Sequence, residues 1–177
     1  YVIKQCAEEI QAIHATKFIN WSSRDNVVLG SDVTFIRPEA RRVAFAKDIT
    51  KSFWGGATVT YAALQIAFHM GFEQVILIGV DHRFEKQGKP GTVVTLDGDD
   101  PNHFDPRYFA DGFQWQLPNL PTSEVAYSLA QEAFENDGRQ IVDATVNGAL
   151  EVFPKVDYLD VVSHIVRSKG LGPLSLG

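Results

Sequence analysis

Residues 97–109, with the sequence DGDDPNHFDPRYF, bring side chains suited to acid–base and metal chemistry together in one short stretch. His103 lies between Asp100 and Asp105. An imidazole titrates ordinarily at about pH 6.5, so it can accept or donate a proton at physiological pH, and a neighbouring carboxylate can orient its ring. His103 is therefore a candidate catalytic residue. The alternative is a loop histidine that bonds a backbone carbonyl.

Three aspartates of the same stretch, Asp97, Asp99 and Asp100, are candidate metal ligands. Mg²⁺ takes carboxylate oxygens together with substrate phosphates. The spacing of these aspartates matches no calcium-binding loop, and acidic turns are often only solvated. The sequence leaves both a Mg²⁺ site and a solvated turn open.

A second group of candidates follows the apolar run QVILIGV, residues 74–80. A continuous β-branched run of this kind predicts a central strand buried on both faces. Residues just past the carboxyl end of such a strand line the crevice of doubly wound folds. Gly79 would let a ligand approach the backbone closely, and Asp81 and His82 would face the crevice. Alternatively, Asp81 only bonds loop amides.

A third group lies in the stretch FWGGAT, residues 53–58, directly before a predicted helix. The N-terminus of a helix presents free N–H groups and a positive dipole to an anion. Gly55, Gly56 and the hydroxyl of Thr58 are therefore candidate phosphate ligands. The stretch lacks a complete dinucleotide or P-loop pattern, so a plain tight turn is the alternative.

The elements that position these candidates alternate between helical and strand patterns. Helices are predicted near the N-terminus and over residues 57–70, 122–136 and 157–164, and strands over 17–21, 33–36, 43–46, 74–80, 139–144 and 149–153. Thr122 is the expected cap of the third helix, and Asp157 that of the last. This alternation predicts an α/β domain with a mainly parallel sheet and helices on both faces. The long segment at 81–121 shows no strong periodicity, and loops of that length tend to be functional.

The composition fits one globular domain. The 177 residues are 45% hydrophobic and 21% charged. A net charge of −6 argues against a nucleic-acid-binding protein, and no apolar run is long enough to cross a membrane. A single cysteine, Cys6, excludes an intrachain disulfide framework and favours a reducing, cytoplasmic setting. We expect one domain over residues 1–165 and a flexible tail at 166–177.

Three stretches together resemble a known family: residues 55–84, residues 100–109, and residues 123–158. They are similar to the 6-hydroxymethylpterin diphosphokinase MptE-like family, over roughly residues 45–158. That family is similar in fold to bacterial lipooligosaccharide sialyltransferases and to motility-associated flagellin glycosyltransferases. The resemblance implies a Rossmann-like fold and a nucleotide-containing substrate.

The resemblance also implies roles for individual residues. In the sialyltransferases a turn of small residues before a helix touches the donor, and Gly55 to Thr58 match that turn. Their strand end GID matches Gly79 to Asp81, and a later asparagine-containing turn matches the sequence around Asn147. His82 and Arg83 stand where those enzymes have phosphate-holding tyrosines, and the planar fork of Arg83 suits a phosphate.

The family's catalytic base is a histidine in the long loop, which His103 matches. The family begins with a strand and a G-N-G-P-S turn that this chain does not contain. We therefore expect an incomplete domain that carries the second part of the nucleotide site.

Three functions follow from the resemblance. The first is a transferase that moves a group, most readily a sugar from a CMP-sugar, to a surface glycan, protein or small-molecule acceptor; this chemistry requires no metal. The second is a pyrophosphokinase that moves diphosphate from ATP to a hydroxymethylpterin and needs Mg²⁺, which Asp97–Asp100 would hold. The third is a non-catalytic module that has kept the fold.

Overall fold

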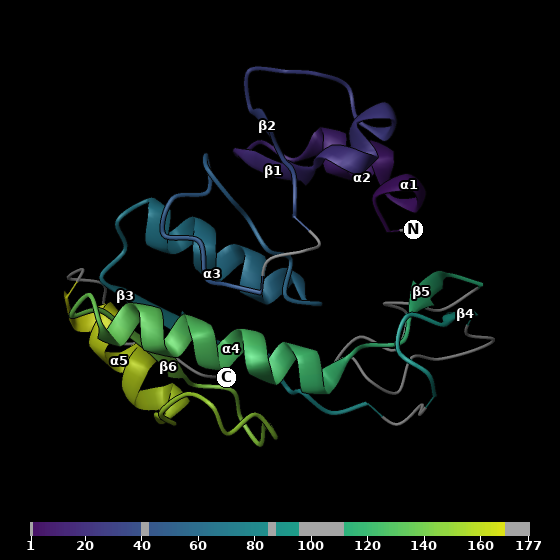
Figure 1. Cartoon of the computed structure of the whole chain (residues 1–177). Helices are drawn as coiled ribbons and strands as arrows, with labels where there is room; N and C mark the ends of the chain where they lie inside the picture. Colours follow the sequence, from purple (N-terminus) through teal and green to yellow (C-terminus); the bar gives the residue numbers. More distant parts are fainter. Residues whose placement is uncertain (1, 40–42, 85–87, 96–111, 169–177) are drawn as a thin grey trace.

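The structure is a computed structural model that describes residues 2–39, 43–84, 88–95 and 112–168. The chain folds as a mixed α/β protein (Figure 1). In chain order the elements are α1 (Val2–Gln5), α2 (Ala7–Ala12), β1 (Lys17–Asn20), the 3₁₀ helix η1 (Trp21–Asn26), β2 (Val33–Ile36), α3 (Val59–His69), β3 (Gln74–Leu77), β4 (Val93–Thr95), β5 (Gln114–Gln116), α4 (Leu120–Glu135), β6 (Gln140–Asp143) and α5 (Tyr158–Ser168). None of the described helices is long and apolar enough to cross a bilayer.

The strands of the described residues form three pairs. β1 pairs with β2 and β3 pairs with β6, both in parallel, whereas β4 and β5 pair antiparallel. The parallel character predicted from the sequence is therefore present, but the described strands are separate pairs and no closed sheet forms among them. The β4–β5 pair lies within residues 81–121, for which the sequence predicted no strand or helix.

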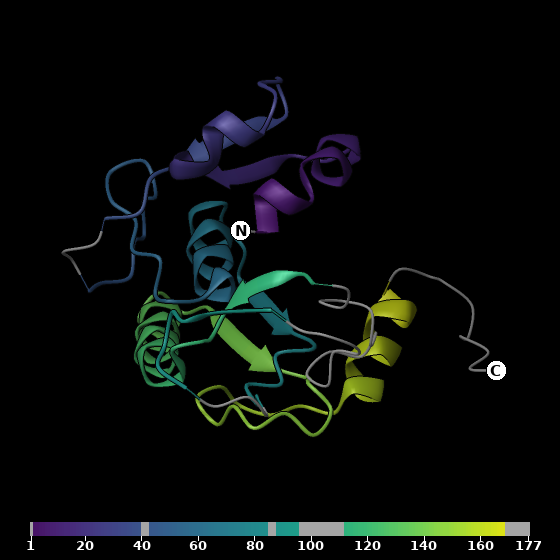
Figure 2. The ribbon, with the colours of Figure 1, turned by 90° about the vertical axis from the view of Figure 1, so that its right-hand side faces the viewer.

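The β3–β6 pair positions the candidate site. Gln74 pairs with Gln140 and Leu77 with Asp143, so both strands point the same way and both end at the same edge. α4 connects the two strands and packs against α3, while α4 and α5 lie on opposite sides of the pair (Figure 2). A parallel pair joined through a helix is the βαβ unit, whose carboxyl-end edge is the usual ligand edge of α/β folds.

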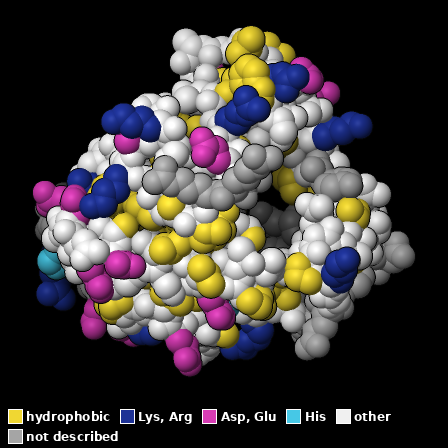
Figure 3. All heavy atoms as spheres, in the orientation of Figure 1, with side chains coloured by type: hydrophobic (Ala, Val, Ile, Leu, Met, Phe, Trp, Pro, Cys, Tyr) yellow, Lys and Arg dark blue, Asp and Glu magenta, His cyan; other side chains and the backbone are white. Residues whose placement is uncertain are grey.

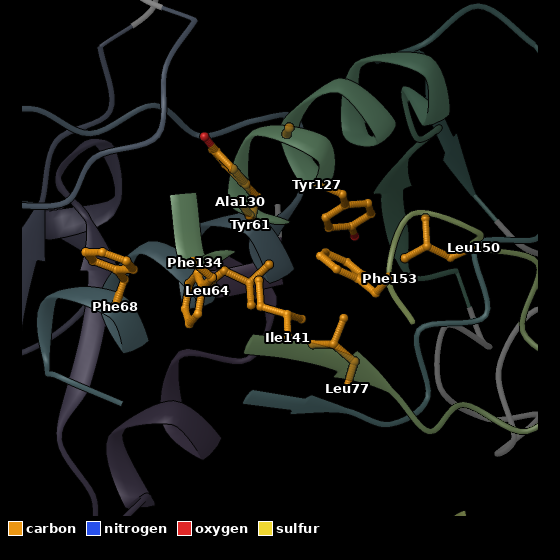
Figure 4. Close-up of a cluster of buried hydrophobic side chains, with 11 residues drawn as sticks. Tyr61, Leu64, Phe68, Leu77, Tyr127, Ala130, Phe134, Ile141, Leu150 and Phe153 are labelled. Atoms are coloured by element: carbon orange, nitrogen blue, oxygen red, sulfur yellow. The ribbon is translucent and has the colours of Figure 1, made fainter. Parts of the chain in front are cut away.

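The hydrophobic core lies between the β3–β6 pair and the two helices α3 and α4 (Figure 4). It consists of buried side chains from all four elements and from the segment after β6: Tyr61, Leu64, Phe68, Leu77, Ala126, Tyr127, Ala130, Phe134, Ile141, Leu150 and Phe153. Phe68 and Phe134 meet edge to face with ring centroids 5.1 Å apart, the arrangement that aromatic quadrupoles favour. Burial raises the pKa of Tyr61, whose hydroxyl donates to the carbonyl of Ala44 at 3.1 Å.

Two predicted strands are wrong. Residues 43–46 are irregular because their backbone bonds to side chains: the Ala46 N–H donates to Oε1 of the buried Gln65 at 2.9 Å. Residues 149–153 are also irregular: the Ala149 N–H donates to the carbonyl of Asp81, and an isolated bridge to Asp143 forms beyond this stretch, at Lys155.

The sequence predicted caps for α4 and α5 but none for α3. The cap of α3 is Thr58, whose Oγ1 accepts the Thr60 N–H at 3.3 Å. Asp157 caps α5 by accepting the Leu159 N–H at 2.8 Å. The prediction of Thr122 as the cap of α4 is wrong: Asn119 is the cap, its Oδ1 accepts the Thr122 N–H at 3.1 Å, and the helix begins at Leu120.

Candidate functional site

A pocket of about 280 Å³ opens where β3 ends. Three segments line it: the start of α3 at residues 57–60, the segment after β3 at residues 79–84, and the start of α4 through Leu120, Ser123 and Tyr127. The lining includes Thr58, Gly79, Asp81, His82 and Arg83, so the structure brings five of the predicted site residues into one pocket.

Thr58 connects the two helices at the pocket. Its Oγ1 caps α3 and lies 3.3 Å from the Tyr127 hydroxyl of α4. The first N–H groups of a helix lack partners within the helix, and the helix dipole is positive at that end. Because α3 and α4 both begin beside the pocket, two positive helix ends flank it.

The two glycines before α3 do not line this pocket. Gly56 has φ +60°, and a Cβ built there would lie 2.3 Å from Cδ1 of Tyr61 and 2.8 Å from the Ala126 Cβ. A glycine at residue 56 is therefore explained by the close packing of the turn against α3 and α4. Gly55 lines a different, apolar groove.

The segment after β3 is held by the segment after β6. The Val80 N–H donates to Thr145 Oγ1 at 3.0 Å, and the Ala149 N–H donates to the carbonyl of Asp81 at 2.8 Å. Gly79 has φ +72° and open space where a Cβ would stand, so it permits the chain to turn at the end of the strand. Among the described residues no loop amide donates to the Asp81 carboxylate, and the link to the loop runs through its backbone.

His82 forms a pair with Glu124 of α4. Its Nε2 lies 3.1 Å from Glu124 Oε1. The His82 side chain is only 7% exposed, whereas that of Glu124 is 57% exposed. The His82 ring also meets the Tyr127 ring edge to face, with centroids 6.0 Å apart. Sequence reasoning singled out neither Glu124 nor Tyr127 as site residues, because nothing in their local pattern shows that the start of α4 faces His82.

Arg83 forms a hydrogen bond with Asn147, another residue that the sequence predicted for the site. The guanidinium Nη2 donates to the Asn147 carbonyl at 3.0 Å, and Asn147 adopts a left-handed backbone with φ +57°. The contact therefore uses the main chain of Asn147 and not its amide side chain. A guanidinium has five N–H donors, so this bond leaves others for a ligand.

The remaining candidates, His103 and the aspartates Asp97, Asp99 and Asp100, lie outside the described residues. Within the described ranges there is no group of three or more histidine, cysteine, aspartate or glutamate side chains that could hold a metal ion. The predicted catalytic and metal-binding roles stay predictions.

An apolar groove of about 560 Å³ runs along the outer side of α3. Its lining includes Phe18 and Ile36 from the β1–β2 pair and Ala63 and Ile66 from α3, with no ionisable side chain among the described residues that line it. Figure 3 shows apolar side chains gathered on the face of the molecule that carries α3 and α4. The groove offers no acid–base or anion chemistry, so the pocket at the end of β3 is the better candidate for function.

Comparisons with protein-family models, curated proteins and solved structures find no match to this chain.

Proposed function

We propose that the chain is a Rossmann-like domain of a transferase that uses a nucleotide-containing donor, most readily a CMP-sugar. One observation carries the proposal: the carboxyl end of β3, the positive ends of α3 and α4, and Arg83 all meet at one pocket. In open α/β sheets this edge is where nucleotide ligands bind.

The chemistry of the lining suits a phosphate. Helix N-termini and guanidinium groups both recur at phosphate sites in proteins. Thr58 adds a hydroxyl at the start of α3, and Gly79 opens the backbone beside it. A volume of about 280 Å³ is near the lower end of small-molecule sites, which suits the phosphate end of a donor.

In the proposed reaction the acceptor hydroxyl oxygen attacks the anomeric carbon of the donor sugar. The bond between that carbon and the phosphate oxygen breaks, and its electron pair leaves on the nucleoside phosphate. Arg83 and the two helix ends stabilise the charge that develops on the phosphate. The resemblance supplies the last role, in which His103 accepts the proton of the acceptor hydroxyl.

Calorimetry of the protein with CMP, CDP, ATP and GTP, each with and without Mg²⁺, tests the proposal. We expect CMP to bind and its affinity to be insensitive to Mg²⁺, because Arg83 and the helix ends supply the positive charge. ATP binding that requires Mg²⁺ would favour the pyrophosphokinase instead. No binding of any of the four would contradict both and support a non-catalytic module.

A further inference from the structure

Three features of His82 distinguish it from the other described histidines. Its side chain is almost fully buried, it lines the pocket, and its backbone has φ +53°. A non-glycine residue in the left-handed region is uncommon, and such strained positions cluster at functional sites. The geometry points to a side chain held in place for a ligand.

Glu124 fixes the orientation of the ring. Its carboxylate accepts the Nε2–H of His82 at 3.1 Å, and the Tyr127 ring packs against the imidazole. A carboxylate that accepts from one ring nitrogen determines which nitrogen remains for other partners. Here the remaining atom is Nδ1, to which no hydrogen bond runs from the described residues.

The pocket beside His82 combines carboxylates with Arg83 and two helix N-termini. The charged and titratable groups near His82 are Glu124 and Tyr127 on α4 and its chain neighbours Asp81 and Arg83, while α3 contributes the uncharged Thr58. Glu124 occupies the Nε2 side of the ring, and Arg83 and the helix ends attract a phosphate to the pocket.

We infer that His82 is a catalytic acid of the proposed transfer, donating its Nδ1 proton to the donor phosphate, and that Glu124 is its positioning residue. This inference rests on the proposed function. As the carbon–oxygen bond to the phosphate breaks, the electron pair stays on the phosphate oxygen, which takes the proton from Nδ1. The neutral imidazole regains a proton from water after the nucleotide leaves.

Proton uptake on binding of CMP tests this inference. Calorimetry in two buffers of different ionisation enthalpy, at about pH 7.5, gives the number of protons bound with the nucleotide. We expect roughly half a proton or more for the wild type, because the proposed acid must carry a proton on Nδ1 when the phosphate is bound. His82→Gln should abolish this uptake, and Glu124→Gln should reduce it about twofold or more.

Two substitutions serve as matched controls. His164→Gln on α5 and Glu132→Gln further along α4 change exposed side chains that do not line the pocket, and both should leave proton uptake unchanged. If His82→Gln does not fold, the wild-type uptake still tests the role of His82, and Glu124→Gln, whose side chain is largely exposed, still tests the positioning role.

The outcomes separate the inference from the proposed function. CMP binding without proton uptake, or uptake that persists in His82→Gln, overturns the role of His82 and leaves the proposed function standing. Uptake that is unchanged in Glu124→Gln overturns the positioning role. Absence of CMP binding by the wild type overturns the proposed function and the inference together.

Discussion

Gly56 shows how one residue type can have either a binding or a packing explanation. The sequence left a phosphate ligand and a plain tight turn open for this residue, and the structure places it against Tyr61 and Ala126. Thr58, two residues later, lies in the pocket. Two residues of one turn therefore have different roles: Gly56 allows α3 to pack against α4, and Thr58 lines the pocket.

Replacing Gly56 with alanine should strongly destabilise the fold. A left-handed backbone costs a non-glycine residue about 1–2 kcal/mol, and overpacking adds about 1–3 kcal/mol. Gly138→Ala is the matched control, because Gly138 has φ +71° and open space around the added Cβ. Urea unfolding should show a loss for Gly56→Ala at least about 1 kcal/mol larger than for Gly138→Ala. Equal losses would refute the packing role.

At the residue scale, sequence reasoning found the side chains that belong to the segment after β3 but missed their partners. Gly79, Asp81, His82 and Arg83 follow an apolar strand, so their place at its carboxyl end is predictable. Glu124 is distant in the chain, and its pairing with His82 depends on how α4 returns across the β3–β6 pair. That is tertiary information which no local pattern carries.

At the scale of the elements, the last residue of β6, Asp143, holds the end of the strand through its buried carboxylate. The Asp143 carboxylate is fully buried; it accepts from Lys155 Nζ at 2.7 Å and from the Thr145 N–H at 2.8 Å. Thr145 in turn accepts the Val80 N–H, so this ion pair supports the segment that follows β3. The irregular segment after β6 thus contributes to the shape of the pocket.

Lys155→Met should destabilise the protein by about 2–3 kcal/mol, because it leaves the buried Asp143 carboxylate without its cation. The cost is lower than for a fully buried ion pair because Lys155 is partly exposed. Lys47→Met is the comparison, since Lys47 pairs with Asp137 at the surface and such pairs contribute less than about 1 kcal/mol. Both values come from chemical unfolding at neutral pH. A Lys155→Met loss no larger than that of Lys47→Met would contradict the structural role of Asp143.

The elements that sequence reasoning predicted well are those with strong internal signals. The strands at β2 and β6 have apolar, β-branched runs, and α3 has apolar residues at helical spacing. β3 is shorter than predicted and only its Leu77 is buried, so the expectation of a strand buried on both faces is wrong. The predicted strands at 43–46 and 149–153 are short, and their backbone groups meet side chains or single bridges instead of a neighbouring strand. Strand formation in such short runs depends on whether a partner strand lies alongside, which the run itself does not determine.

For the whole molecule, the pocket results from the parallel alignment of β3 and β6. Because both strands end at the same edge, the segments that follow them meet, and Arg83 contacts Asn147 across that edge. α3 and α4 begin at the same place, so positive helix ends add to a positive side chain. The alternation of elements in the sequence predicts such an edge, but the residues that meet there follow only from the three-dimensional arrangement.

Calorimetric titration of CMP into the wild type and into Arg83→Met tests the central claim most directly. Arg167→Met on α5 is the control, because this arginine does not line the pocket. We predict that CMP binds the wild type, that Arg83→Met weakens binding about tenfold or more through loss of a charged hydrogen-bond donor, and that Arg167→Met has no effect. CMP binding of equal strength in Arg83→Met, or no binding by the wild type, would contradict the assignment of this pocket as the site of the donor phosphate.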